Sequence, residues 1–524
     1  MRKKTKKPLS FSTTMRNPER IAAFLQCIEP FEEKILTNSL INEIVKKIIK
    51  SKLYYTMYQK GKKDLLEIYK SLDKDYTDEQ ILDIITNSPQ NHKEAGFDKG
   101  WASRFDTWFK LSKEFGFIYY KINEPIKISQ TGHMLCNAYN TTDNPNTGEN
   151  IQNIFLNALC KYQTNNPFRK NLNKNLPIIL LLKTIFLLKN DTDENGVGIS
   201  RKELAFLLCW DNNDPQSLYK FIKDFRKKYG YKASDENIYA KCLSLLESNN
   251  ENRFKMSQII KEGIDDLVRK LRMTGIFSLR GMGRFLDLNS FKQDTIEYLI
   301  KNYGKYKDFS SELEYFSYMG EIDSNILKIK NRVSITNLDK IRINALKKFA
   351  KIYSSKTISK ELINLEQSKN SKDEYLKGID NPTRLEFLIS LSLIQKYPQA
   401  TIKPNYAIDD EGNPIFTARG GIADIELYDT NSDSLIEVTL LQNRSQSINE
   451  IPSITRHLDE FKNISKKNLV FSLFIAPKIH QDTIYMCQFT KNQYNLDILP
   501  YTISDFTIKL FNTKTINDFF NKEF

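Results

Sequence analysis

The chain of 524 residues is poor in the residues that bind structural zinc or form disulfide scaffolds. It has six cysteines and four histidines, and no two cysteines form a Cys-x-x-Cys pair. Because zinc fingers require closely spaced Cys and His ligands, that class of protein is excluded. Scattered cysteines also argue against a disulfide framework and favour a reducing compartment, so we expect a cytoplasmic protein.

Long hydrophobic runs are also scarce. The most apolar segment, 176–188, is interrupted by Pro177 and Lys183 and is too short to cross a bilayer. The basic N-terminus, residues 1–7, is not followed by an apolar core, which argues against a secretion signal. A chain of 524 residues is instead expected to fold as about three or four globular domains.

Positive charge is abundant but unevenly distributed. The chain carries a net charge of +14, yet residues 381–524 hold 14 lysines and arginines against 17 acidic residues. The first 380 residues therefore hold 64 basic against 47 acidic residues. A basic excess of this kind indicates a polyanion such as DNA as partner, because lysine and arginine displace counterions from phosphates. The alternative is a lysine-rich surface that only keeps the protein soluble.

The first 150 residues suggest a helical module with a β-hairpin. Segments 35–53 and 101–115 have apolar residues at helical spacing, and Gly116 ends the second of them. Short β-like runs follow at 117–122 and 126–129, before a helix that restarts near Met134. Helices followed by two short strands form the outline of a winged helix, although a plain helical bundle is the alternative.

The same outline recurs in residues 151–300. Helical patterns cover 176–188 and 217–229, the second of which is strongly basic and suits a nucleic-acid backbone or groove. Between them, Ser200 and Glu203 have the spacing of a capping box at a helix start. Two β-like runs around Arg-Gly-Met-Gly-Arg, at 276–288, suggest a second wing. We therefore expect two winged-helix-like DNA-recognition modules, 1–150 and 151–300, and a helical linker over 301–380.

The pattern changes to mixed α/β from residue 381 onward. A helix is expected from Asn381, with Glu386 early in it. Strand patterns follow in Ala423–Asp429 and Ser434–Leu441, joined by a polar turn at 430–434. In such a hairpin, Asp424 and Glu437 can lie side by side on neighbouring strands, and Glu437 and Thr439 face the same way.

Such a pair of carboxylates has the chemistry of a nuclease site. Hydrolysis of a phosphodiester requires a divalent cation that binds a phosphate oxygen and activates a water molecule, and Mg²⁺ prefers carboxylate ligands. Asp424 and Glu437 match the order of the PD-(D/E)xK nuclease core, except that Glu-Val-Thr replaces Glu-x-Lys. The spacing alone is also that of ordinary surface carboxylates on a hairpin.

Further polar residues surround this pair in the sequence. Glu450 lies 13 residues beyond Glu437 and precedes the next expected helix. Glu386 can reach the pair from its own helix. Arg456 and His457 are candidates for binding the scissile phosphate or moving a proton, and their alternatives are a helix-surface arginine and a structural histidine.

Several segments of the sequence resemble those of a known family. Three C-terminal segments, 420–426, 435–440 and 444–458, resemble the AlwI-type family of type IIS restriction endonucleases, a group of BstNBI-, PleI- and MlyI-like enzymes with strand-nicking relatives. The N-terminal segment 8–20 resembles the same family. Motifs at both ends imply that the resemblance covers nearly the whole chain.

The resemblance implies a multidomain α+β fold, with helix-rich, winged-helix-like DNA-binding modules before an α/β PD-(D/E)xK nuclease domain at 381–524. It implies recognition of a short asymmetric double-stranded DNA site and Mg²⁺-dependent cleavage a few base pairs away. The family's carboxylates carry over to Glu386, Asp424, Glu437 and Glu450, with His457 close by. Asp424 and Glu437 would hold the metal. Because the lysine is absent, the group that activates the water is open among Glu450, a bridging carboxylate and His457.

Other interpretations remain open from the sequence. The chain could nick one strand, or be the large subunit of an enzyme that needs a small subunit or transient dimerisation to cut both strands. A cognate DNA methyltransferase is implied as part of the same system. From another class, the chain could be a non-catalytic winged-helix regulator. Candidate DNA-binding residues, chosen by their basic character near the expected helices and wing, are Arg104, Lys110, Arg280, Arg284 and Arg456.

Overall fold

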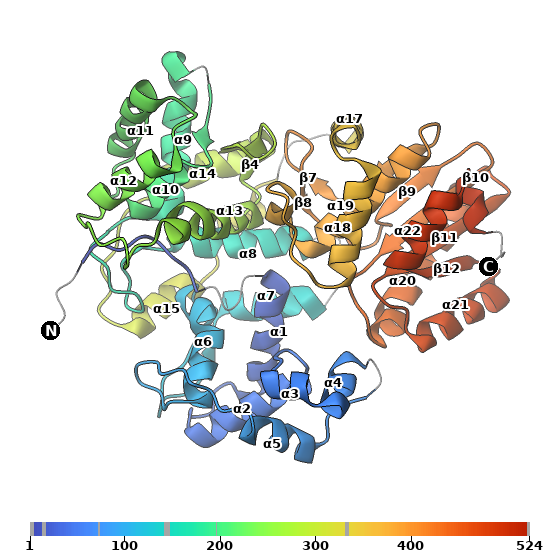
Figure 1. Cartoon of the computed structure of the whole chain (residues 1–524), viewed down its shortest axis with the longest axis horizontal. Coiled ribbons are helices and arrows are strands. Elements are labelled where there is room, and N and C mark those ends of the chain that lie inside the picture. Colours follow the sequence, from blue (N-terminus) through green and yellow to red (C-terminus); the bar gives the residue numbers. More distant parts are fainter. Residues whose placement is uncertain are drawn as a thin grey trace. The chain divides into compact units, whose positions relative to one another are not determined.

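A computed structural model describes residues 5–12, 17–71, 74–140, 147–194, 196–330 and 335–520. The chain divides into two compact units: Met1–Asn140 with Glu149–Asn331, and Thr141–Gly148 with Arg332–Phe524. Figure 1 shows the elements of both along the chain. The two expected recognition modules, 1–150 and 151–300, fall within the first unit except for residues 141–148, which belong to the second. The expected linker, 301–380, is helical but is divided between the two units rather than forming a separate connector.

The first unit is rich in helices. Its helices are α1 (Pro18–Ile28), α2 (Asn38–Lys50), α3 (Met57–Gly61), α4 (Lys63–Lys70), α5 (Asp78–Thr86), α6 (Trp101–Glu114), α7 (Gln130–Asn140), α8 (Thr147–Lys161), α9 (Pro177–Asn190), α10 (Leu204–Cys209), α11 (Pro215–Tyr229), α12 (Asp235–Leu245), α13 (Ile264–Met273), α14 (Gln293–Asn302), α15 (Glu312–Gly320) and α16 (Ser324–Lys328). Its strands are β1 (Ile118–Tyr119), β2 (Lys127–Ile128), β3 (Ile199–Ser200), β4 (Phe277–Arg280) and β5 (Phe285–Leu288).

In helix α6, the apolar residues at helical spacing form part of the hydrophobic core. Phe105, Trp108 and Phe109 recur at helical spacing and are fully buried. Trp108 packs edge-on against Phe24 of α1, with ring centroids 5.6 Å apart.

The expected helices at 35–53, 101–115, 176–188 and 217–229 are confirmed as α2, α6, α9 and α11, and the expected hairpins as β1–β2 and β4–β5. Helix α7 begins at Gln130, earlier than expected.

The expected helix start at Ile199 was wrong. Ile199 and Ser200 form strand β3, which pairs with β5 in a three-stranded sheet of order β3-β5-β4. The capping-box hydrogen bonds are present: the Ser200 amide donates to Glu203 Oε2 at 2.8 Å, and the Glu203 amide donates to Ser200 Oγ at 3.3 Å. These hydrogen bonds close the turn that precedes α10. The capping-box motif is therefore present, but Ser200 belongs to a strand and the helix begins only at Leu204.

The second unit contains the mixed sheet. Its helices are α17 (Ile335–Ile352), α18 (Ser355–Glu366), α19 (Asn381–Lys396), α20 (Ile451–Ile464), α21 (Gln481–Tyr494) and α22 (Ile503–Asn512). Its strands are β6 (Thr401–Pro404), β7 (Ala407–Ile408), β8 (Pro414–Phe416), β9 (Ile425–Tyr428), β10 (Ser432–Val438), β11 (Leu469–Ala476) and β12 (Asp497–Thr502). The expected helix from Asn381 and the two expected strands are confirmed, although β10 already begins at Ser432.

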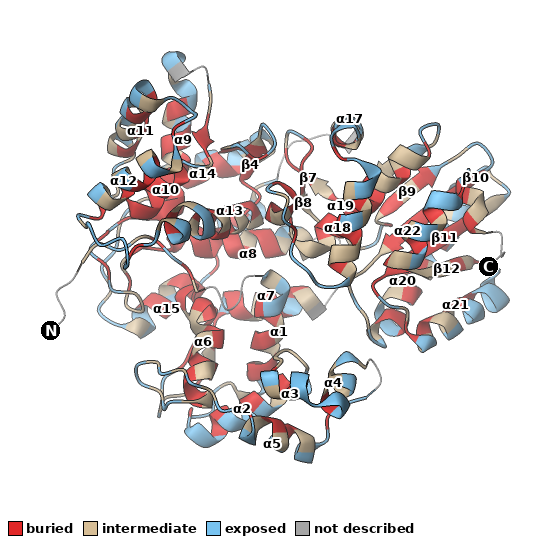
Figure 2. Cartoon of the chain, viewed as in Figure 1, coloured by how far each residue is buried: buried red, intermediate tan, exposed pale blue. Residues whose placement is uncertain are grey.

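The five-stranded sheet has the order β12-β11-β10-β9-β6. Strand β10 is parallel to β11 and antiparallel to β9. Buried residues from β10, β11 and β12 pack against α20 and α21 to form one core cluster, which includes Leu435, Phe474, Ile454, Leu458 and Cys487. The central strands β10 and β11 are almost entirely buried, whereas the edge strands β12 and β6 are only partly buried. Figure 2 shows buried residues along the strands. This packing fixes α20 relative to β10.

All six cysteines are buried free thiols, so no disulfide supports either unit. Across the part of the chain that the structure describes, no helix is both long and apolar enough to span a membrane.

Gly116 gives a test of the packing in the first unit. It has φ +73°, and an added Cβ would lie 2.3 Å from Met319 Cβ of α15. We expect Gly116→Ala to destabilise the protein by about 2–4 kcal/mol, from left-handed backbone strain and overpacking together. Urea unfolding followed by circular dichroism measures this loss. Gly61→Ala is the control, since its Cβ would meet nothing within 4 Å. Equal stability of the two variants would contradict the close approach of α15.

Candidate active site

Asp424 and Glu437 stand opposite each other at the end of the β9–β10 hairpin. Ile425 pairs with Ile436 in the antiparallel register, which places Asp424 opposite Glu437 one position further. The Val438 amide donates to Asp424 Oδ2 at 2.7 Å, and the Asp424 amide donates to Glu437 Oε2 at 3.3 Å. Each carboxylate is therefore held by the backbone of the other's strand.

Glu437 also contacts His457 of α20. His457 Nδ1 lies 2.9 Å from Glu437 Oε1. Both side chains are largely buried, with 12% of the His457 side chain and 8% of the Glu437 side chain exposed. His457 Nε2 is buried and has no hydrogen-bond partner in the described part of the chain. The histidine is thus placed to orient Glu437 through one ring nitrogen.

Glu386 comes to this site from helix α19. It is only 3% exposed, and its Oε2 accepts a hydrogen bond from the Ala418 amide at 3.0 Å. The loop after β8 therefore fixes its carboxylate. Glu450 is the last residue of a π-helical turn, Gln446–Glu450, directly before α20. Its charge acts on Asp424, so the structure brings together the acidic residues that the sequence singled out.

Mutual repulsion and burial dominate the electrostatics. Burial, followed by the charge of Glu437, raises the pKa of Asp424 well above its ordinary value. Burial, followed by the charge of Asp424, raises the pKa of Glu386 in the same way. Amide hydrogen bonds from Val438 and Ala418 act in the opposite direction. Burial and the neighbouring acids therefore favour the protonated form of these carboxyls, and a bound cation would favour the ionised form.

Thr439 occupies the position of the missing lysine. Its amide donates to the Ile475 carbonyl of β11 at 3.0 Å. Its hydroxyl accepts from the Leu441 amide at 3.2 Å. Thr439 thus holds the chain where it leaves β10 and supplies no cation in place of lysine.

Asn405 is a positioning residue that the sequence analysis missed. It is buried, and its amide donates to the Asp424 carbonyl at 2.8 Å. Its side-chain Nδ2 donates to the Ala423 carbonyl at 2.8 Å and to Glu426 Oε1 at 3.0 Å. These bonds fix the backbone on which Asp424 stands. The only local signal is an asparagine directly after the edge strand β6, which is also an ordinary turn residue.

The donor set suits a hard divalent cation but is sparse. Asp424 and Glu437 supply adjacent carboxylate oxygens, and Mg²⁺ commonly takes one or two carboxylates with water completing its shell. Among the described residues, no group of three or more His, Cys, Asp and Glu side chains is arranged to hold a metal ion. A two-carboxylate site is therefore the arrangement that the structure can offer.

The candidate DNA-binding residues of α6 are committed to contacts within the protein. The Arg104 guanidinium lies 5.4 Å from the centre of the Tyr54 ring, and its Nε donates to Gln90 Oε1 at 2.9 Å. Lys110 Nζ lies 3.1 Å from Glu94 Oε2. Both side chains remain partly exposed, so DNA contact by them stays a prediction.

The other basic candidates differ in exposure. Arg280 Nη2 donates to the Leu288 carbonyl at 3.2 Å, which anchors it to the hairpin. Arg284, at the turn between β4 and β5, is exposed, as is Arg456 on α20. On exposure, Arg284 and Arg456 are therefore the better candidates for contact with DNA.

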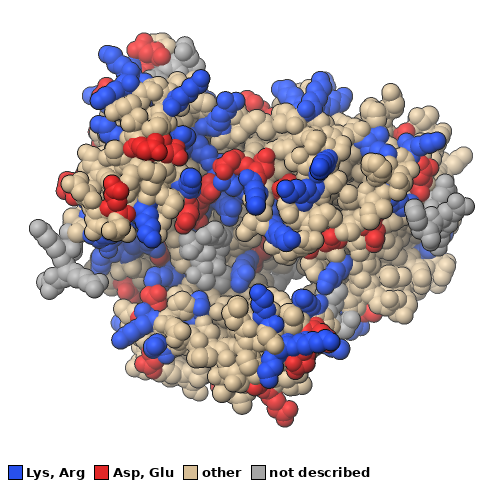
Figure 3. All heavy atoms as spheres, viewed as in Figure 1, with Lys and Arg blue, Asp and Glu red and all other residues tan. Residues whose placement is uncertain are grey.

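The basic helix α11 is not uniformly directed to solvent. Arg226 is buried, and its Nε and Nη2 each lie 2.8 Å from a carboxylate oxygen of Glu203. Lys220, Lys227 and Lys228 of the same helix are exposed. Lysine and arginine side chains are prominent over α9 and α11 in the upper left of Figure 3. The exposed lysines form the basic face, and the arginine holds the helix in place.

Comparisons with known proteins identify the family. The AlwI restriction endonuclease family matches residues 113–381 and 323–508. No curated protein sequence matches the chain. The chain belongs to the AlwI restriction endonuclease family, so it is a restriction endonuclease and acts on double-stranded DNA. The resemblance seen in the sequence is confirmed.

Solved structures give looser matches. The small subunit of the heterodimeric restriction endonuclease R.BspD6I is 23% identical, covering 30% of this chain and 77% of that chain, with a TM-score of 0.26. The restriction endonuclease FokI is 12% identical over 98% of this chain and 97% of that chain, with a TM-score of 0.24. FokI bound to DNA gives the same identity and TM-score, with coverage of 96% and 95%. The family assignment rests on the sequence match.

Burial of Asp424 beside other acidic groups is expected to lower the stability of the folded protein. We expect Asp424→Asn to raise the melting temperature at pH 7 in metal-free buffer, by about 2–4 °C for each kcal/mol gained. Because the folded-state pKa of Asp424 is raised, its destabilising charge is present above that pKa. The gain should shrink as the pH falls from the raised folded-state pKa towards about 4, the ordinary pKa of aspartate, below which the carboxyl is protonated in both states. Differential scanning calorimetry measures both effects.

The matched control for this test is Asp459→Asn, on the exposed surface of α20. We expect its melting temperature to stay within about 1 °C of the parent, as for a surface change worth only a few tenths of a kcal/mol. A lower melting temperature for Asp424→Asn than for this control would show that the carboxylates do not repel each other in the folded protein.

Proposed function

We propose that the chain is a type IIS restriction endonuclease. Its first unit would recognise a short asymmetric site in double-stranded DNA, and its second unit would hydrolyse phosphodiester bonds a few base pairs away. The interlocked pair Asp424 and Glu437 is the observation that carries this proposal. Its place on two neighbouring antiparallel strands, in a chain of the AlwI restriction endonuclease family, supports a PD-(D/E)xK type of site.

The proposed cofactor is Mg²⁺, held by Asp424 and Glu437. When bound, it would supply a Lewis acid for a phosphate oxygen and lower the pKa of a water ligand. The raised pKa of Asp424 supports a cation at this point, since a positive charge would relieve the repulsion. Glu386 would support the site from α19, where the Ala418 amide fixes its carboxylate.

His457 and Glu450 take different roles in this proposal. His457 Nδ1 contacts Glu437, while its Nε2 is buried, so we propose that the histidine positions Glu437 rather than accepting the proton of water. Glu450 lies near enough to affect the pKa of Asp424. With lysine replaced by Thr439, Glu450 is the candidate acceptor for the proton of the attacking water.

The first unit supports DNA recognition by its fold and charge. The β3-β5-β4 sheet, with helices α10, α11, α12 and α13 between β3 and β4 in sequence, resembles a winged helix in its strand order, and this resemblance supports the proposal. Exposed lysines on α11 would contact phosphates, and Arg284 at the β4–β5 turn is placed like a wing residue. We propose a second subunit or transient dimerisation for second-strand cleavage, and a cognate DNA methyltransferase as functional partner.

Asp424→Ala tests the metal site. We expect cleavage of plasmid DNA in Mg²⁺ to fall by at least about a thousandfold, because electrostatic stabilisation of the reacting phosphate is lost. Specific DNA binding, measured by fluorescence anisotropy, should be nearly unchanged. Asp459→Ala on α20 is the matched control and should cut at the parental rate. Mg²⁺-dependent cutting by Asp424→Ala would sink the assignment, and mapping both strands' cut ends would give the offset and strand behaviour.

His457→Phe separates positioning from chemistry. Loss of the Nδ1 contact should leave Glu437 less well oriented, so we expect cleavage to need about 10–100 times more Mg²⁺ for half-maximal rate. Saturating Mg²⁺ should restore most of the rate if the histidine only positions the carboxylate. A rate that stays low at every Mg²⁺ concentration would instead assign His457 a direct role in proton transfer. Anisotropy with cognate DNA checks that binding is retained.

A further inference from the structure

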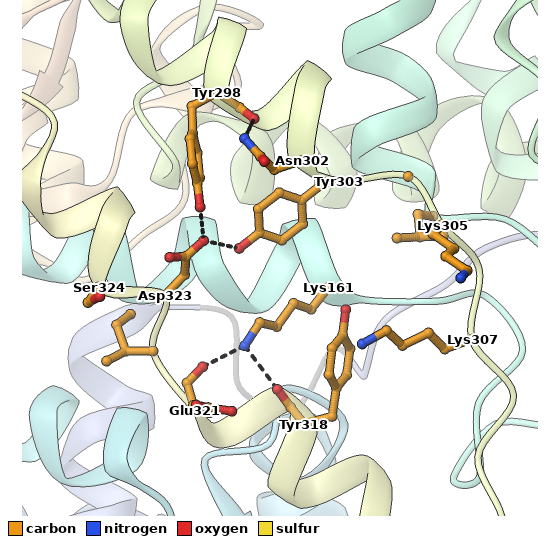
Figure 4. Close-up of a pocket in the computed structure, with 13 residues that line it drawn as sticks. Lys161, Tyr298, Asn302, Tyr303, Lys305, Lys307, Tyr318, Glu321, Asp323 and Ser324 are labelled. Atoms are coloured by element: carbon orange, nitrogen blue, oxygen red, sulfur yellow. Dashed lines mark hydrogen bonds between the residues drawn. The ribbon is translucent and has the colours of Figure 1, made fainter.

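The first unit contains a cavity of about 390 Å³, well away in sequence from the acidic site. Its lining comes from the end of α8, the end of α14 with the segment that follows it, and the connection between α15 and α16. Figure 4 shows lysine and tyrosine side chains from these elements around it. The segment 301–307, Lys-Asn-Tyr-Gly-Lys-Tyr-Lys, belongs to the region that the sequence indicated as a linker.

Lysine ammonium groups give the cavity an affinity for anions. Lys161 is 7% exposed, and its Nζ donates to the carbonyls of Tyr318 and Glu321 at 2.9 and 2.6 Å. A lysine ammonium has three hydrogens, so one further donor remains available. Lys305 and Lys307 line the opening and are exposed.

The acidic residues of the cavity do not cancel this charge. Asp323 already accepts hydrogen bonds from the hydroxyls of Tyr298 and Tyr303, at 2.7 and 2.8 Å. Glu321 contributes its main-chain carbonyl to Lys161. Three lysines and two acidic residues line the cavity, so the lining keeps an excess of positive charge that would suit a phosphate group.

Aromatic rings form much of the remaining wall. Tyr298, Tyr303 and Tyr318 line the cavity, and the Lys307 ammonium lies 4.1 Å from the centre of the Tyr318 ring. Tyrosine rings stack on nucleic-acid bases of any sequence. Asn302 adds an amide that can donate to or accept from the edge of a base. The volume lies within the range of small-ligand sites.

We propose that this cavity binds a single nucleotide unit, with its phosphate on Lys161, Lys305 and Lys307 and its base against the tyrosines. The unit has two possible sources, a free 5′-mononucleotide or a nucleotide turned out of the DNA that the enzyme holds. The site lies within the first unit alone, and it requires neither the metal nor the carboxylates of the proposed function.

One photoreactive probe can test both sources in the full-length protein. The Asp424→Ala variant, which keeps DNA intact, would be irradiated with 4-thiothymidine 5′-monophosphate, or with cognate duplex carrying one 4-thiothymidine at successive positions. Mass spectrometry would then map the crosslinked peptides. We expect crosslinks on Tyr303 or Tyr318. Crosslinks from the free nucleotide assign that source, and crosslinks from one duplex position only assign the extruded nucleotide.

Lys307→Ala in the same background should lower the crosslink yield at least tenfold, because the phosphate loses an exposed ammonium. The control is Lys46→Ala on α2, a solvent-exposed lysine outside the cavity, which should leave the yield unchanged. Circular dichroism verifies that both variants fold. Absence of crosslinks to cavity residues from either probe, or equal yields for the two variants, would overturn the proposal. Neither result bears on cleavage, so the proposed metal site is judged separately by its own variants.

Discussion

The antiparallel pairing of β9 with β10 is the constraint on which the acidic site depends. It places Asp424 opposite Glu437 and lets the backbone of each strand bind the carboxylate of the other. The two acids stay side by side because the hydrogen-bonded pairing of β9 with β10 holds their backbones. Carboxyl groups with strongly raised pKa values are frequent at functional sites, where charged groups are arranged for a ligand rather than for the fold.

Other elements contribute by fixing the surroundings of this pair. Packing of α20 on the sheet brings His457 to Glu437, and α19 carries Glu386 to the same place. Asn405 ties the backbone before β9 to the edge strand β6. The site is therefore assembled from helices α19 and α20, the β9–β10 hairpin and the residue after β6, and each is held by apolar packing or backbone hydrogen bonds.

In the first unit, too, some charged side chains hold the fold together while others face solvent. Within the basic helix α11, Arg226 forms a buried ion pair with Glu203, whereas neighbouring lysines are exposed. Composition showed a basic excess but could not tell an inward arginine from an outward lysine. The cavity around Lys161 shows the reverse case, because a segment expected to be part of a helical linker contributes several of its lining residues.

Local sequence determined much of the fold and the identity of the acidic residues. Helical periodicity located helices such as α6 and α11, and alternation located β9 and β10. The family's sequence motifs supported Asp424 and Glu437 as site residues. All of these signals lie within a few helical turns or one hairpin. Tertiary structure alone decided that Ile199 and Ser200 form a strand, that Asn405 supports Asp424, that His457 bonds Glu437, and that a cavity exists. Those outcomes depend on pairing between distant segments, for which neighbouring residues carry no signal.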